Sequence, residues 1–514
     1  MSEQNSVIVG GEKNIVNDEY AGIVGGQQNR VNGTYSLIGG GRNNEINGGS
    51  SGEDSFIGGG RENNITGSAI AISGGYQNTA TGGSSAICGG TQNKATGEYS
   101  FIGGGEKNYA GDKSTDYYAT ICGGYLNNAS NQYTFIGGGQ NNKASNEYST
   151  IGGGIKNKAQ GLGSFVGGGG YSASAPWGNY AEGENSAVVG GLLNNASGSY
   201  SFVGGGYLNT VSNDYSVVSG GYVNNASNNY ATISGGHANK ASNTYATVSG
   251  GHSNTASFNA ATVSGGENNI AGHNYATVGG GDYNTANGLY SFIGGGYLNN
   301  ASGLSAVVCG GQENKVTESY SFIGGGQQNN ITGRYSAIPG GYKNTVKGNY
   351  SYAFGRNVIV NNNSFAVFYS NSSSGYFRIN TNNESDEPLI VGEPGGNNGN
   401  GAYLSKAGVW QGASSKTFKE DFKDVDAKEI LEKIMTLDIK NYKYKGNNPA
   451  RHITPFAEDI YYTFNVGENP KYLSALDVAG LSMVAIQELK KENNELKQEI
   501  ENLKQRLSKL EHEQ

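Results

Sequence analysis

A fifteen-residue pattern of apolar and polar positions repeats from the start of the chain to about residue 350. Each unit can be anchored on a glycine, from Gly10 to Gly340. Ile or Val stands two residues before the anchor, Asn stands four residues after it, and Ala, Val or Ile follows two residues beyond the Asn. Alternating segments interrupted by Gly-Gly and by Asn/Ser-Gly pairs predict two short strands and two turns in each unit.

Repetition at a fixed period predicts that each unit is one coil of a β-solenoid, with about 22 coils stacked on one another. The Ile/Val position requires an interior stripe of branched side chains. Because neighbouring strands lie about 4.8 Å apart, the stack is expected to form a rod on the order of 100 Å long. The anchor glycine is expected to allow positive φ or close backbone approach. The recurring Asn, missing only at Ser172, is expected to stack its amide on those of neighbouring coils.

Three insertions interrupt the period, after the anchors Gly40, Gly104 and Gly168. Insertions between repeats map to surface loops, commonly on a binding face. The third insertion is the longest and brings one of only two tryptophans in the chain. A Trp beside carboxylates suits stacking on a sugar, and a Trp that fastens a loop explains the pattern equally well. The candidate receptor or glycan contacts are Trp177, Tyr180, Glu182 and Glu184.

Tyrosine recurs five residues before the anchor, as in Tyr200 and Tyr215, and often two residues after it, as in Tyr207. Such a ladder either binds glycans or packs between coils or between protomers. His237 and His252 occupy the second tyrosine position, so we interpret them as substitutions within that set and not as a metal pair.

Composition narrows the class of protein further. With 87 Gly and 35% hydrophobic residues in 514, the chain does not resemble a set of ordinary globular domains. The net charge of -8 disfavours nucleic acid as a partner. We expect neither a signal peptide nor a membrane-inserted segment. The cysteines recur only at whole-repeat separations without His partners, so we expect small packing residues, no metal site and no cofactor; they are Cys88, Cys122 and Cys309.

The coils resemble the head repeats of trimeric autotransporter adhesins. The residues that carry this resemblance are the two halves of one coil, 230–235 (YATISG) and 239–242 (NKAS). The resemblance implies a left-handed parallel β-roll in which three chains lie side by side. The doubled or tripled glycines and the strict fifteen-residue step depart from the adhesin pattern.

The C-terminal sequence predicts three further regions after the 1–350 shaft. Residues 351–413 indicate a β-rich neck and linker, and the composition then changes to Lys, Glu and Leu. Apolar positions predict a helix over 427–437 within a small α+β domain at 414–485. Residues 486–514 form a heptad pattern typical of a coiled coil, which by itself does not choose two strands over three. The a and d positions are Ile486, Leu489, Asn493, Leu496, Ile500, Leu503, Leu507 and Leu510.

Four segments of this domain resemble, in motif order, the C-terminal intramolecular chaperone of phage endosialidases, tailspikes and tail fibres. They are 431–434 with 442–444, 452–459 (HITPFAED), 476–481 (LDVAGL) and 485–489 (AIQEL). The resemblance implies that the domain trimerises the nascent fibre and then cuts itself off with a Ser/Lys dyad. A Ser and a Lys five residues apart are on their own a weak signal, because a lysine serves as a base only if its pKa is lowered.

Carried over by motif position, the resemblance implies that Ser414 is the nucleophile and Lys419 its base. His452 matches the family's histidine in a supporting role, and the bond broken is Ala413–Ser414. Ser415 and Thr454 depart from the family pattern, in which Asp or Asn and Gly are usual.

The sequence therefore predicts a homotrimeric phage tail fibre or related receptor-binding protein, matured by autocatalytic release of residues 414–514 and assembled in the host cytoplasm. Its partner would be a host-surface glycan or protein. One alternative is a glycan-degrading tailspike, which needs two carboxylates about 5–10 Å apart. The clustered acidic candidates in the rod are Asp112/Asp116 and Glu182/Glu184. A second alternative is a bacterial cell-surface adhesin.

Overall fold

The computed structural model describes residues 5–48, 53–171, 177–361, 365–370, 375–378, 389–391, 402–404, 410–412, 416, 419–443, 445, 450–467 and 469–512. The chain divides into two compact units. One holds the fifteen-residue repeats and the other holds the helices α1 to α3, and we describe each by itself.

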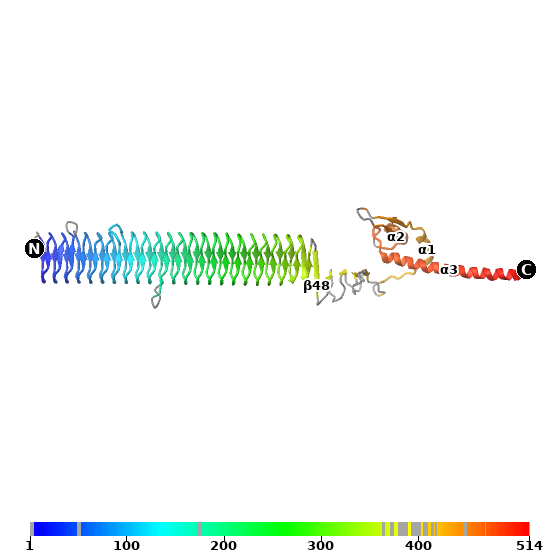
Figure 1. Cartoon of the computed structure of the whole chain (residues 1–514), viewed down its shortest axis with the longest axis horizontal. Coiled ribbons are helices and arrows are strands. Elements are labelled where there is room, and N and C mark those ends of the chain that lie inside the picture. Colours follow the sequence, from blue (N-terminus) through cyan, green and yellow to red (C-terminus); the bar gives the residue numbers. More distant parts are fainter. Residues whose placement is uncertain are drawn as a thin grey trace. The chain divides into compact units, whose positions relative to one another are not determined.

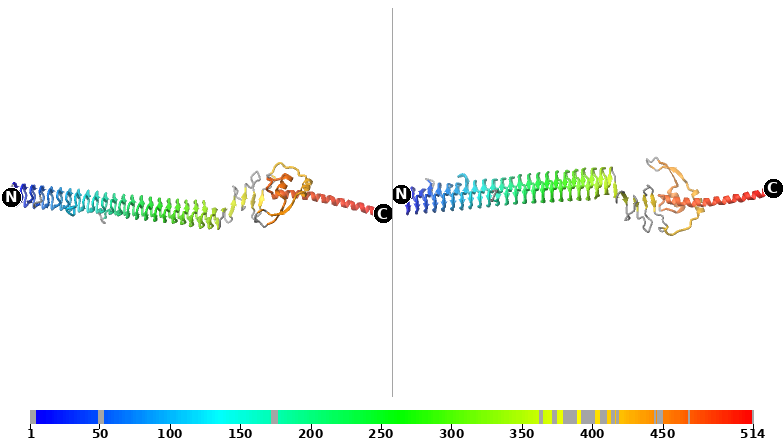
Figure 2. Two further views of the ribbon diagram at one scale, coloured as in Figure 1. Left: turned by 90° about the horizontal axis from the view of Figure 1, so that it is seen from above. Right: turned by 60° about the horizontal axis from the view of Figure 1, so that its bottom comes forward.

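The repeats form a β-solenoid of about 23 turns whose coils each contribute one strand to each of two parallel sheets (Figures 1 and 2). In the coil that begins at Ser201, these strands are β25 (Phe202–Val203) and β26 (Thr210–Val211). The first sheet contains the odd-numbered strands from β1 (Val7–Ile8) to β43 (Ala337–Ile338), and the second contains the even-numbered strands from β2 (Ile15–Val16) to β42 (Asn330–Ile331). Nearly all of these strands are two residues long. The predicted solenoid with two strands per period is confirmed.

Register between coils is exact along the regular part of the stack. Phe202 pairs with Val217 in the first sheet, and Thr210 pairs with Asn225 in the second. Because the step equals one period, equivalent side chains lie above one another. At about 4.8 Å per coil the 23 turns span about 110 Å.

The core lies between the two sheets and is built from the predicted positions. In the coil of β25 and β26, Val203 and Val211 have no exposed surface, and the neighbouring Ile233 and Ala226 are equally buried. The strands are so short that each places only one side chain inward. Isoleucine, valine and alanine therefore fill a narrow interior, and each coil contributes two buried apolar side chains to it.

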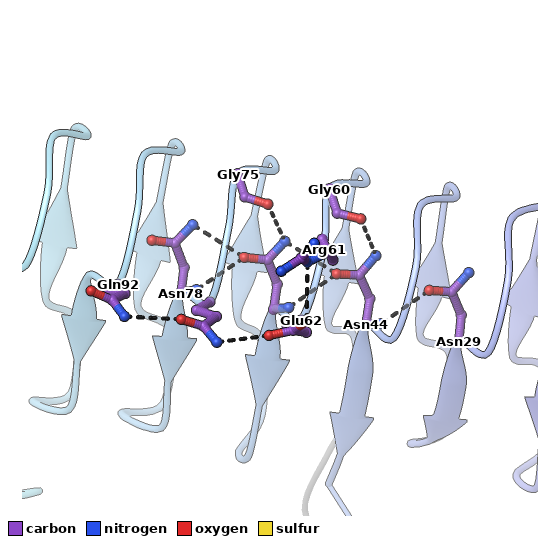
Figure 3. Close-up of polar contacts among 10 residues, drawn as sticks. Asn29, Asn44, Gly60, Arg61, Glu62, Gly75, Asn78 and Gln92 are labelled. Atoms are coloured by element: carbon purple, nitrogen blue, oxygen red, sulfur yellow. Dashed lines mark hydrogen bonds and ion pairs between the residues drawn. The ribbon is translucent and has the colours of Figure 1, made fainter.

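The recurring asparagines form a buried ladder along this core (Figure 3). Asn209 donates from Nδ2 to the carbonyl oxygens of Gly205, 2.8 Å away, and Gly221, 2.9 Å away. Its Oδ1 accepts the backbone N–H of Asn224 at 3.0 Å. The amide thus fastens its own coil to the next one mainly through the backbone, while the predicted amide-to-amide contact also occurs in several coils.

The ladder does not break at Ser172 as the sequence suggested, because Asn179 continues it. The Asn179 N–H donates to Asn157 Oδ1 at 2.9 Å, and its Nδ2 donates to the Gly168 carbonyl at 2.8 Å. Within the insertion, Tyr171 and Trp177 form an antiparallel bridge. The coil therefore resumes its register after the insertion, with the asparagine delayed by seven residues.

The glycine that the fold requires is the one after the anchor. Gly191 has φ of 88°, and a Cβ placed on it would overlap the carbonyl oxygen of Gly206 in the next coil. A Cβ placed on the anchor Gly190 would meet nothing within 4 Å. The expected positive φ occurs at the anchor in some coils, as at Gly205 with 152°, but the close backbone approach lies one residue after the anchor.

The cysteines are exposed, contrary to the expectation of packing residues. Each stands one position after the inward Ile or Val, as Cys88 follows Ile87, and strand alternation turns it outward.

The solenoid continues beyond residue 350. Strand β46 (Tyr352–Arg356) pairs with β43 and with β44 (Gly341–Tyr342), and β47 (Ile359–Val360) pairs with β45 (Thr345–Val346). Strand β48 (Phe365–Ser370) then pairs in parallel with β46. The remaining strands of this stretch are β49 (Gly375–Arg378), β50 (Leu389–Val391), β51 (Ala402–Leu404) and β52 (Trp410–Gly412).

The C-terminal unit contains three helices and one hairpin-like strand pair. Helix α1 (Ala427–Met435) begins at Asp426, whose carboxylate accepts the N–H groups of Lys428 and Glu429. It ends two residues before the predicted Leu437, because Thr436 donates its hydroxyl to the Lys433 carbonyl at 2.7 Å. Strand β53 (Lys440–Tyr442) pairs antiparallel with β54 (His452–Thr454), and α2 (Ala457–Phe464) follows.

Helix α3 (Ala475–His512) runs for 38 residues and contains the whole heptad pattern. It begins eleven residues before the predicted coiled coil, and its first part packs against α1. The apolar heptad residues stay 50–64% exposed beside the described part of the chain; they are Ile486, Leu489, Leu496, Ile500, Leu503, Leu507 and Leu510.

Candidate functional site

The predicted cleavage site lies partly outside the described residues. Ala413, Ser414 and Ser415 belong to the part of the chain for which no placement is described. The juxtaposition of Ser414 with Lys419 or His452 therefore stays a prediction.

Lys419 lies on an exposed, extended segment that leads toward α1. Its backbone N–H donates to the Lys416 carbonyl at 3.3 Å, which forms a single turn next to the predicted cleavage site. The residue is exposed in a single chain.

His452 is half-buried on β54, directly opposite Tyr442 on β53. The two rings have centroids 6.0 Å apart, and the Tyr442 ring also lies 5.9 Å from the ring of Phe456. The Tyr442 hydroxyl forms a hydrogen bond with the Thr454 hydroxyl at 2.8 Å. His452 is thus held on a rigid strand pair, and Thr454, the residue that departs from the family pattern, takes part in fixing its neighbour Tyr442.

A cavity of about 790 Å³ opens beside His452. It is lined by β54, by the start of α2 and by the segment that enters α3. Sequence reasoning did not single out its aromatic lining, Tyr442, Phe456 and Tyr472. Among the described residues no cluster of three His, Cys, Asp or Glu side chains is arranged to hold a metal ion.

The candidate receptor contacts around the third insertion fall into two groups. Trp177 is 50% exposed and closes the base of the insertion through its bridge with Tyr171. Tyr180, in contrast, lies on the regular strand β22 (Tyr180–Ala181), where the Lys158 ammonium is 5.1 Å from its ring centroid. Only Trp177 therefore belongs to the loop itself.

The acidic residues near the insertions have local partners. Glu184 accepts a hydrogen bond from the Tyr200 hydroxyl at 3.3 Å, and Glu182 is exposed in the same turn. Asp116 accepts the backbone N–H groups of Asp112 and Lys113 and so closes the turn of the second insertion. The Asp116 carboxylate is 8% exposed and serves the loop.

The tyrosines five residues before the anchor form stacked runs along one edge of the solenoid. Tyr200, Tyr215, Tyr230 and Tyr245 have ring centroids 5.0–5.1 Å apart and interplanar angles of 2–15°. All of them have φ near +57°, a conformation that is uncommon for bulky residues. The tyrosines therefore stack between coils, which is one of the alternatives that the sequence left open, and they remain about half exposed.

These features define a β-solenoid that carries a small α+β module with a long, apolar-striped helix. Residues 414–465 match the family model described as the chaperone of endosialidase, which confirms the resemblance of this module. No curated protein matches the chain. Among the described residues no helix is long and apolar enough to cross a membrane.

Proposed function

We propose that this protein is a homotrimeric tail fibre of a phage, with a receptor-binding rod and a C-terminal chaperone that is released after assembly. The observation that carries the proposal is the match of residues 414–465 to the chaperone of endosialidase, placed after a β-solenoid of about 23 turns. Such a fibre is assembled in the cytoplasm of the host and becomes part of the virion tail. Its partner is a glycan or protein on the host surface.

The burial pattern of the C-terminal unit supports assembly with other copies. Only Ile460 and Ala485 are fully buried apolar residues among those described beyond residue 415. The apolar face of α1 is half-buried, and the heptad positions of α3 are exposed. Apolar stripes of this kind are buried when helices of several chains pack together.

In the proposed cleavage, the Ser414 hydroxyl attacks the carbonyl carbon of Ala413 while the neutral Lys419 amine accepts the hydroxyl proton. The Ala413–Ser414 C–N bond breaks as an ester forms, and the Ser414 nitrogen takes up a proton. Water then hydrolyses the ester, which leaves the Ala413 carboxylate and the Ser414 amine. Because Lys419 is exposed in one chain, we infer that trimer formation buries it and orients it toward Ser414, so that cleavage follows assembly.

The test is an intact-mass measurement of the wild type and of Ser414→Ala after assembly. We expect the wild type to split into residues 1–413 and 414–514, and Ser414→Ala and Lys419→Ala to remain whole. Ser415→Ala is the matched control and should split like the wild type. A wild-type chain that stays at full length in the assembled fibre would contradict self-cleavage.

A further inference from the structure

Two one-coil interruptions divide the tyrosine ladder in the second half of the solenoid. Ala260 stands between Tyr245 and Tyr275, and Ser305 stands between Tyr290 and Tyr320. Elsewhere in this half, from Tyr200 to Tyr350, every coil has tyrosine at this position. We call the two positions in the ladder where Ala260 and Ser305 replace a tyrosine the notches.

The backbone runs through the notches without any change. The φ values of Ala260 and Ser305 are 51° and 52°, close to those of the flanking tyrosines. Ala260 donates its N–H to the Thr244 carbonyl at 2.9 Å, and Tyr275 donates to Asn259 at 2.9 Å. Since the register is kept and the same left-handed backbone carries tyrosine in the other coils, only the side chain is missing.

The width of each notch is therefore two steps of the ladder. Ring centroids next to the notches are 5.0 Å apart for Tyr230 and Tyr245 and 5.1 Å apart for Tyr275 and Tyr290. Two steps place the facing rings about 10 Å apart, which leaves room for one further ring in the stack. Within a run neighbouring tyrosines stack on both ring faces, whereas at a notch Ala260 or Ser305 supplies no ring to stack on the two facing tyrosines.

We propose that each notch holds one sugar ring of a surface polysaccharide between two tyrosine faces. The inference rests on the proposed function and names the receptor class and its place on the rod. A sugar ring offers a C–H face to each aromatic ring and hydroxyl groups at its rim, so it can use both the stack and the tyrosine hydroxyls.

The surroundings of the first notch favour a neutral, hydroxyl-rich ligand. Its turns carry the uncharged polar residues Thr244, Asn259 and Asn274. The Thr244 hydroxyl donates to Asn228 Oδ1 at 3.3 Å and Asn274 Oδ1 accepts the Asn259 N–H at 3.2 Å, which leaves the Asn274 Nδ2 group for a sugar hydroxyl. Phe258, on the same turn as Ala260, stacks on His273 at 5.4 Å and adds aromatic surface. A nucleobase would also fit between rings, but the net charge of -8 offers no counterpart for phosphates.

The spacing of the notches suits one extended chain. Ala260 and Ser305 are three coils apart, which corresponds to about 14 Å along the solenoid. The second notch is the more apolar, because Leu289 and Leu304 precede Tyr290 and Ser305 in their turns. One polysaccharide strand running along this edge can thus place separate sugar rings in both notches.

The test measures binding of the full-length fibre to an array of bacterial surface polysaccharides and to host cells. The double variant Ala260→Tyr/Ser305→Tyr closes both notches with the residue that the other coils carry. We expect binding to fall about tenfold for each closed notch, since stacking between rings is worth about one such factor. Ala69→Tyr is the matched control, because its neighbours Asp54 and Ser84 are not aromatic and no notch is closed.

Tyr215→Ala opens a new notch between Tyr200 and Tyr230 and should increase binding to the same polysaccharide. Unchanged binding of the double variant overturns the notch proposal and leaves the receptor-binding fibre in place. A change in the native mass of the double variant also overturns it, because the notches would then hold side chains of a second copy. Wild-type fibre that binds neither the array nor host cells overturns the receptor-binding function together with the notches.

Discussion

The solenoid and the C-terminal unit differ in how much of their apolar surface a single chain covers. Each coil of the solenoid buries its Ile or Val, its Ala or Val and its ladder Asn almost completely. In the C-terminal unit, α1 buries none of its residues and α3 leaves its apolar heptad positions exposed. One chain thus covers the inward positions of the rod, whereas the described residues of the C-terminal unit leave the apolar positions of α1 and α3 partly or largely uncovered.

This difference indicates that two kinds of interaction stabilise the two regions. The rod depends on repeated short-range contacts between adjacent coils, so its stability grows coil by coil. If the proposed trimer forms, the C-terminal unit depends on association between chains and therefore on concentration. Releasing the C-terminal unit after assembly would therefore remove the region whose stability depends on concentration and leave the solenoid, whose core one chain covers.

The largest expected effect comes from breaking the contacts between copies. Leu496→Lys/Leu503→Lys places two charges in the apolar stripe of α3, where association would have to desolvate them. We expect native mass spectrometry to show single chains in place of trimers. The same charge change on the opposite face of the helix, Gln498→Lys/Gln505→Lys, is the control and should leave the trimer mass unchanged.

Within the rod, a pair of adjacent glycines sharpens the comparison. Gly221→Ala adds a Cβ at φ of 99° that overlaps the Gly236 carbonyl, so we expect a loss of about 2–4 kcal/mol of local stability. Gly220→Ala adds a Cβ whose nearest neighbour is 3.8 Å away and should change stability much less. Urea unfolding followed by circular dichroism measures both. Equal losses would show that the close approach of Gly221 does not limit the coil.

The asparagine ladder allows a second matched pair. Asn224→Ala removes the side-chain hydrogen bonds to the Gly220 carbonyl and the Asn239 N–H, and it leaves the Gly236 carbonyl with only the backbone N–H of Tyr222. We expect a loss of about 2–3 kcal/mol, because buried polar groups without hydrogen bonds are costly. The next residue, Asn225, points outward, and Asn225→Ala should change stability by less than about 0.5 kcal/mol. If thermal unfolding shows no difference between them, the ladder is not a source of stability.

The smallest expected effect is a pH dependence on the rod surface. Gln328 and Gln312 donate to the Glu313 carboxylate at 2.7 and 2.8 Å and lower the pKa of that group below its ordinary value of 4.5. The charged group therefore stabilises the fold above its ordinary pKa, and this contribution is lost as the pH falls through the lowered value. The difference in melting temperature between wild type and Glu313→Ala should shrink between pH 7 and pH 3. If the difference in melting temperature stays constant with pH, the charge of the Glu313 carboxylate does not contribute to stability.

Much of the rod was predictable because its period repeats. A stripe of Ile or Val and one Asn per fifteen residues define which side chains point inward. The sequence did not distinguish Gly190 from Gly191, because only the backbone shows which one approaches the next coil. The sequence also predicted Ser172 in place of the ladder asparagine, whereas Asn179 takes that position. In the sequence, an asparagine shifted by an insertion cannot be told apart from one that has been replaced.

The C-terminal unit was less predictable. The heptads gave the later part of α3, but its start at Ala475 precedes them, because that part packs on α1 and need not follow a heptad. The family resemblance of this unit is confirmed, whereas the Ser414 and Lys419 dyad is a prediction about an assembled state. The lining of the His452 cavity by Tyr442, Phe456 and Tyr472 depends on tertiary contacts that no spacing in the sequence indicates.

The central claim is that one chain completes the rod while several chains complete the helices. Hydrogen–deuterium exchange of Leu496→Lys/Leu503→Lys tests it most directly, because peptides report the solenoid and α3 separately in one sample. The account predicts that amides of the coils stay as protected as in the wild type, while amides of residues 475–512 exchange much faster. Fast exchange throughout the coils, or unchanged protection of α3, would contradict it.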